Sequence, residues 1–249
     1  MPNDDVVQHG IVPRVLALLD ASRHSLAALS IATDLACSRH AELVALFVED
    51  RDLLSCAEFP FSCEVGMSSG MARPLSPSAL EASLSRQRES VRQALSATVA
   101  GREIRHSLKV SRGRVVAEAL ALATSSDVLV LGKAGGSSQW GGRLGSTSRV
   151  LMLKAPCTVL LWDTTYPMEQ GPLLVMGEGG DSATPEWLAN SPLFDGVARL
   201  TEMSASSLER RVAISPYGAL LLRRSQLARL VDEDPELMAR LPMPIIVVP

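Results

Sequence analysis

The stretch "GKAGGSSQWGGRLGSTS" (residues 132–148) decides how the rest of the chain is interpreted. It holds six glycines and five serines or threonines, and it lies between the apolar run "DVLVL" (127–131) and the helix-like "RVLMLKAP" (149–156). A glycine-rich connection from a strand to a helix brings the unpaired amides of the helix start close to a ligand, and such amides favour phosphate. The stretch therefore indicates nucleotide phosphate binding. A flexible surface loop rich in glycine and serine is the alternative.

Strand-like and helix-like segments alternate on both sides of this stretch. Helical periodicity follows the first strand, with Ser22 as the expected N-cap, and a later helix is expected to end at Gly101. Alternating strands and helices with short connections predict an α/β fold, a doubly wound parallel sheet with helices on both faces. Ligands of such sheets bind at the carboxyl ends of the strands. The predicted strands are 14–20, 42–50, 104–110, 127–131 and 158–162.

Residues 51–78 interrupt the alternation. They mix Pro, Gly and Ser with isolated large apolar residues, so neither a helical nor a strand period can be read. A connection of this length is expected either to cover the ligand or to form a partner surface, and a mobile insertion is the alternative.

The composition excludes several classes of protein. The 249-residue chain carries a formal net charge of −3, which gives no overall attraction for nucleic acid or anionic membranes. No apolar run approaches the roughly 20 residues that span a bilayer, and the start resembles no secretory signal, so a cytoplasmic location is expected. The four cysteines and four histidines show no metal-ligand spacing, and no structural metal site is expected.

The second half of the chain echoes the end of the first. "LMARLPMPIIVVP" (237–249) repeats the order helix, proline, strand of "LMLKAPCTVLLW" (151–162), which predicts two units, residues 1–163 and 164–249. The second unit is shorter by one or two strand–helix pairs. It has no glycine segment between its last two predicted strands, so we expect no phosphate loop there.

The spacing Gly132-x2-Gly135-x9-Gly145-Ser146 resembles the nucleotide motif of the universal stress protein family. "LLDAS" (18–22), "LVALFV" (43–48) and the Ala-Pro-Cys before the last strand extend the resemblance over residues 14–162. Two departures are Ala21 in place of the usual glycine and Leu18 in place of a frequent proline. The resemblance implies ATP or ADP as ligand, with Mg²⁺ on the phosphates. The implied contacts are Leu19 and Asp20 with ribose and adenine, Val48 with adenine, Gly132 and Gly135 with ribose and phosphates, and Gly145, Ser146 and Thr147 with phosphates. From the residues themselves, Lys133 and Arg143 add positive charge.

Three functions are compatible with this pattern. The first is a stress-response regulator that binds an adenine nucleotide and, through it, alters affinity for a protein partner. The second is a slow ATPase or nucleotidyl-transfer enzyme, although no acid–base pair is found. The third is a ligand-free scaffold. The family resemblance implies dimers formed through the last strand, so either a homodimer or an intrachain pseudo-dimer is expected. Asp20 has an alternative role as a cap of the first helix.

Overall fold

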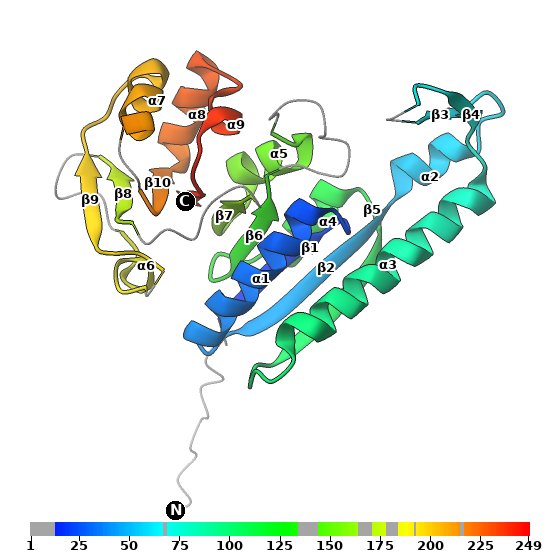
Figure 1. The fold of residues 1–249 in the computed structure, drawn as a ribbon, viewed down its shortest axis with the longest axis horizontal. Coiled ribbons are helices and arrows are strands. Elements are labelled where there is room, and N and C mark those ends of the chain that lie inside the picture. Colours follow the sequence, from blue (N-terminus) through cyan, green and yellow to red (C-terminus); the bar gives the residue numbers. More distant parts are fainter. Residues whose placement is uncertain are drawn as a thin grey trace, which may run out of the picture.

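One nine-stranded sheet joins the two halves of the molecule, in the order β5-β2-β1-β6-β7-β11-β10-β8-β9 (Figure 1). The computed structural model describes residues 13–66, 69–133, 144–163, 171–177, 184–191, 193–214 and 217–249. The strands of the sheet are β1 (Arg14–Leu19), β2 (Glu42–Asp50), β5 (His106–Gly113), β6 (Val128–Gly132), β7 (Thr158–Trp162), β8 (Leu173–Met176), β9 (Val197–Leu200), β10 (Ala219–Arg223) and β11 (Ile245–Val248).

The helices cover both faces of this sheet. They are α1 (Arg23–Ser38), α2 (Arg51–Ala57), α3 (Pro77–Val99), α4 (Val115–Leu122), α5 (Ser146–Lys154), α6 (Glu186–Ala189), α7 (Ala205–Ile214), α8 (Arg224–Glu233) and α9 (Leu237–Arg240). None of these described helices is both long enough and apolar enough to cross a membrane.

The first half confirms the predicted doubly wound parallel sheet. Strands β1, β2, β5, β6 and β7 pair in parallel. Val15 and Ala17 of β1 pack in one core with α1 and α3, whereas Leu16 between them packs in a second core with α4 and α5. Successive side chains of a strand point to opposite faces, so a strand buried on both faces has a continuous apolar sequence. Ser22 caps α1 by accepting from the Ser25 amide, as predicted.

The described part of residues 51–75 contains more regular secondary structure than the sequence indicated. Asp50 caps α2 by accepting a hydrogen bond from the Asp52 amide at 2.9 Å. Strands β3 (Cys63–Val65) and β4 (Ala72–Pro74) then form a hairpin that projects beyond the sheet (Figure 1). We call α2 and this hairpin the arm. The apolar side chains of the hairpin are exposed, so no burial period could mark its strands. These exposed side chains are Val65 and Met71, and Phe59 and Phe61 are exposed in the turn between α2 and β3.

The second half repeats most of the strand order of the first. Its parallel strands follow the order β9-β8-β10-β11, which matches β2-β1-β6-β7, and no described strand stands where β5 would be. One strand–helix unit is therefore missing from the described second half. Strand β9 and helix α7 were not predicted, because β9 has only four residues and an exposed edge. The expected boundary at residue 163 falls between β7 and β8 and stays a prediction.

The two halves meet through their last strands, β7 and β11, which pair antiparallel. Leu160 lies opposite Ile246, with Val159 opposite Val247 and Leu161 opposite Ile245. Leu160 and Ile246 hold the same place in the echoed segments 151–162 and 237–249, so equivalent residues of the two halves lie opposite each other. The last strands of the two halves thus pair within one chain, and the choice between a homodimer and an intrachain pseudo-dimer stays a prediction.

Two cations, the buried Lys133 and the half-buried Arg224, cross this junction in a reciprocal manner. Lys133 follows β6 directly, and its Nζ donates to the Leu241 carbonyl of the second half at 3.0 Å. Arg224 follows β10 directly, and it donates to the Cys157 and Met152 carbonyls of the first half at 2.9 and 3.2 Å. Because β6 and β10 hold equivalent places beside the last strands, each half sends one cation to the other's helix end.

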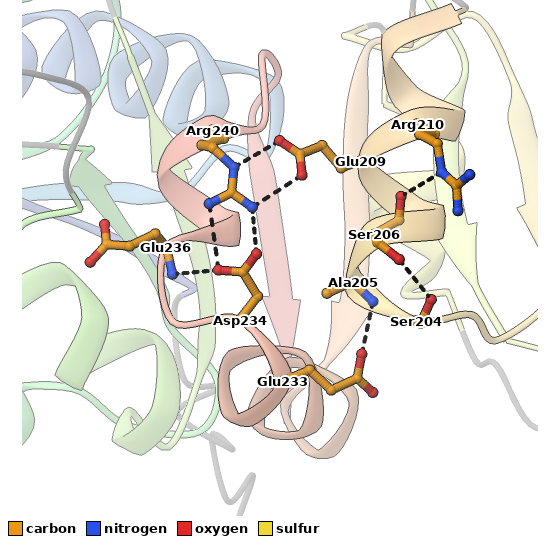
Figure 2. Close-up of polar contacts among 9 residues, drawn as sticks. All are labelled: Ser204, Ala205, Ser206, Glu209, Arg210, Glu233, Asp234, Glu236 and Arg240. Atoms are coloured by element: carbon orange, nitrogen blue, oxygen red, sulfur yellow. Dashed lines mark hydrogen bonds and ion pairs between the residues drawn. The ribbon is translucent and has the colours of Figure 1, made fainter.

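A surface network holds the helices of the second half together (Figure 2). Arg240 donates to both carboxylate oxygens of Glu209, at 2.7 and 3.0 Å, and also to Asp234. Its hydrogen bonds lower the pKa of the Glu209 and Asp234 carboxyl groups. Glu233 of α8 accepts from the Ala205 amide at the start of α7, at 2.8 Å. These contacts join α7, α8 and α9 into one layer.

Candidate functional site

A cavity of about 340 Å³ opens at the carboxyl ends of β1, β2 and β6. Its volume is within the usual range for small-molecule sites. It adjoins the topological switch point of the sheet, where the order of the strands reverses. Strands β2 and β5 lie on one side of β1, and strands β6 and β7 lie on the other side. Seven of the predicted site residues line it together: Leu19, Asp20, Val48, Gly132, Gly145, Ser146 and Thr147.

The start of α5 provides the polar end of this cavity. Gly145 is the N-cap residue, with φ −58° and ψ 139°, and no side chain caps the helix within the described residues. The first amides of α5, at Ser146 and Thr147, therefore carry the partial positive charge of a helix start toward the cavity wall. Ser148 donates to the Gly132 carbonyl at 2.9 Å, which fixes the helix start to the end of β6.

Asp20 supports the turn before α1 rather than capping the helix itself. Its Oδ1 accepts from the Ser22 amide at 2.9 Å, while Ser22 supplies the cap through Ser25. Asp20 is exposed and lines the cavity, so its carboxylate stands beside any ligand there. Its predicted contact with ribose is compatible with this position.

Ala21 adopts a backbone conformation that favours glycine, with φ +61°. Glycine, which is usual at this position in the family that the sequence resembles, adopts such a conformation without strain. An alanine in this left-handed region costs about 1 kcal/mol or more. The cost falls on the backbone of the turn, and no ligand-facing side chain is lost.

Replacing Ala21 by Gly is expected to stabilise the protein by about 1 kcal/mol, because glycine relieves the left-handed strain. The free energy of unfolding in urea measures the effect. Ala97→Gly in the exposed part of α3 is the matched control, and it is expected to destabilise by about 1 kcal/mol. Destabilisation by both substitutions would contradict a strained Ala21.

Gly132 is needed for packing between β6 and α1. A Cβ atom here would lie 2.9 Å from both the His24 carbonyl carbon and the Ser25 amide nitrogen, which are backbone atoms. Glycine at this position was predicted to let a ligand approach closely. Packing against the backbone of α1 is a second reason for glycine here. The sequence motif does not separate these two roles.

Gly132→Ala is expected to destabilise the protein by about 2 kcal/mol, because the start of α1 must shift. Gly113→Ala is the control, since its Cβ would meet only the flexible end of the Glu118 side chain. Chemical denaturation of the two variants compares them directly. An equal, small effect at both positions would show that the α1 backbone yields without cost.

Lys133 lies apart from the cavity. It is buried, and its Nζ donates to Leu241 across the junction of the two halves. Burial lowers the pKa of the Lys133 ammonium, and the nearby Asp163 carboxylate acts in the opposite direction. Asp163 also pairs with the His24 ring at 3.0 Å. The Lys133 ammonium thus lies at the junction of the two halves and outside the cavity lining. Gly135 and Arg143 lie outside the described residues.

The equivalent place in the second half is filled by protein side chains. Strand β10 ends at Arg223 and α8 begins at Arg224, so no loop separates them. Gln226 in the first turn of α8 is buried. It accepts from the Arg223 amide at 2.9 Å and donates to the Met176 carbonyl at 3.2 Å and to Glu202 at 2.9 Å. The start of α8 is thus engaged internally, and Glu202 adds negative charge beside it.

Several cavity residues were not predicted. Asp50 is the last residue of β2, Leu53 lies in α2, Leu84 and Gln87 lie in α3, and Val115 lies in α4. The arm was interpreted as a loop, and Leu84 only as part of the buried face of a helix. Only the path of the chain brings them to the site. Within the described residues, no group of three or more His, Cys, Asp or Glu side chains is arranged to hold a metal ion.

No protein-family model matches this chain, and no curated protein matches its sequence. Its structure is similar to that of a universal stress protein from Archaeoglobus fulgidus DSM 4304, with a TM-score of 0.56 and 13% identity, over 94% of this chain and 97% of that one. It is also similar to a functionally unknown protein from Pseudomonas aeruginosa PAO1, with a TM-score of 0.52 and 11% identity, over 96% of this chain and 92% of that one. The chain therefore has the universal stress protein fold, and the likeness includes its second half.

Proposed function

We propose that the first half binds one adenine nucleotide, ATP or ADP, and that the protein acts as a stress-response regulator in the cytoplasm. One observation carries the proposal: the described residues of the glycine motif and the ends of β1 and β2, which are distant in sequence, line one cavity at the start of α5, which no side chain of the described residues caps. Amides at a helix start bind phosphate, and the apolar walls suit a base. Because Lys133 lies in the junction, the proposed phosphate contacts do not include it.

The arm offers a path from ligand to partner. Leu53 of α2 lines the cavity, while the turn between α2 and the hairpin exposes Phe59 and Phe61. A nucleotide that contacts Leu53 favours one position of α2, and α2 carries the hairpin. We propose that a protein partner distinguishes the loaded from the empty form at this exposed surface.

Binding is favoured over catalysis by the residues of the cavity. Phosphoryl transfer requires charge clamps on the phosphates and a group that orients the nucleophile. Among the described lining residues the charged side chains are Asp20 and Asp50, which bear the same sign as phosphate. They suit a Mg²⁺ ion carried by the phosphates, for which they are oxygen ligands.

The direct test is to identify what the purified protein carries. Gentle purification, heat denaturation and mass spectrometry are expected to release ATP or ADP at close to one molecule per chain. Titration calorimetry with ATP on the emptied protein is expected to give one site. Absence of any released nucleotide, together with no heat of binding at millimolar ATP, would remove the proposed ligand and favour the scaffold.

A further inference from the structure

Gln87 of helix α3 lines the cavity and carries a side-chain amide. Gln87 is half-buried and stands one turn after Leu84, which also lines the cavity. The next residue, Arg88, turns instead to Glu49 at 3.3 Å. Residues three apart share a face of a helix, so Leu84 and Gln87 present an apolar and an amide surface side by side. No hydrogen bond links the Gln87 amide to another described residue.

The order of the strands places Gln87 at the end of the cavity away from the phosphates. The start of α5 follows β6, whereas the arm and α3 follow β2, and β1 lies between these two strands. Two strand spacings separate them by about 10 Å. A nucleotide with its phosphates at Gly145 and Ser146 would therefore extend across the end of β1. Its base would reach the side lined by Leu53, Leu84 and Gln87.

A carboxamide can read one base edge with two hydrogen bonds. It holds one acceptor oxygen and one donor nitrogen side by side. Adenine presents the complementary pair at N6 and N7, a donor and an acceptor. The same edge of guanine presents two acceptors, O6 and N7, so one of them would face the carboxamide oxygen.

We propose that Gln87 recognises the N6 and N7 edge of adenine and makes the site selective for adenine over guanine nucleotides. The inference rests on the proposed nucleotide binding at the same cavity. It assigns α3 a part in ligand choice, in addition to the phosphate contacts of the glycine motif.

The test compares ATP, GTP and 7-deaza-ATP, which lacks the N7 acceptor, by titration calorimetry. The wild-type protein is expected to bind ATP about tenfold or more tightly than either analogue, the discrimination typical of a two-bond contact. Gln87→Ala is expected to weaken ATP binding about tenfold and to bind ATP and 7-deaza-ATP alike. Gln93→Ala is the matched control, because Gln93 is exposed on the same helix and donates to Glu89.

Two results would overturn the inference in distinguishable ways. If wild-type and Gln87→Ala proteins bind ATP equally, the site stands but Gln87 does not read the base. If the wild-type protein binds none of the three nucleotides, both the inference and the proposed function fail. Thermal unfolding of each variant establishes that a loss of binding is not a loss of the fold. The wild-type protein is expected to prefer ATP over 7-deaza-ATP, and Gln87→Ala is expected to lose this preference. General destabilisation of the protein would not remove the preference selectively.

Discussion

Replacing Gly145 by Asp is expected to lower the affinity for ATP at least about a hundredfold while the protein stays folded. Gly145 is the N-cap of α5 and lines the cavity, so a carboxylate there stands against the phosphates. Like charges brought together in a binding site cost several kcal/mol. The fold tolerates the change, because φ −58° suits any residue and Asp is a favoured N-cap.

Gly145→Asn is the control for this substitution. Asn has nearly the shape of Asp and caps a helix equally well, but it carries no charge. Calorimetric titration with ATP is expected to show a much smaller loss for Asn than for Asp. If Gly145→Asp binds ATP as the wild-type protein does, the phosphates do not lie at α5. Equal losses for the two variants would indicate steric exclusion rather than charge.

Arg14→Met is expected to destabilise the protein by about 3 kcal/mol, the usual cost of leaving a buried charge without its partner. Asp127 is 2% exposed, and Arg14 donates to both of its oxygens at 2.9 and 2.7 Å. Arg73→Met is the control, since the ion pair of Arg73 with Glu64 is exposed and its loss should change stability by less than about 1 kcal/mol. Urea denaturation compares the two.

The same substitution has a defined pH dependence. Burial alone would raise the pKa of Asp127, but hydrogen bonds from Arg14 and Thr124 outweigh it and lower the pKa. The stability contributed by a lowered pKa is present above the unfolded value, about 3.9, and is lost as the pH falls through the folded one. The difference between wild type and Arg14→Met should therefore shrink below about pH 4. A constant difference down to pH 2 would contradict the role of the Asp127 charge.

The sequence predicted those parts of the fold in which burial follows a regular period. The strands of the first half are buried on both faces, so their apolar runs were readable, and Ser22 marked the start of α1 by its capping chemistry. The arm was missed because its hairpin buries almost nothing. Strand β9 was missed because only Leu200 of its four residues is buried.

The sequence predicted those site residues that a local motif or a strand end marks. It did not predict the residues that only the tertiary fold brings to the cavity. Strand ends and the glycine segment pointed to six of the seven residues found together in the cavity, and the family resemblance added Leu19. Lys133 has the charge of a residue that binds phosphate, but its side chain donates to the Leu241 carbonyl in the second half. No local sequence pattern indicates that the second half lies next to Lys133. Gln87 has no neighbouring motif, and α3 alone brings it to the cavity.

The pairing of β7 with β11 has a consequence for how the protein assembles and responds. Two separate chains joined by this edge would dissociate on dilution, whereas here a covalent linker holds the partner at a fixed effective concentration. The paired form is then independent of expression level. Since Gln226 and Glu202 occupy the equivalent place in the second half, the proposed function gives one chain a single nucleotide site. We expect its response to nucleotide concentration to be hyperbolic, without the steepness that two coupled sites allow.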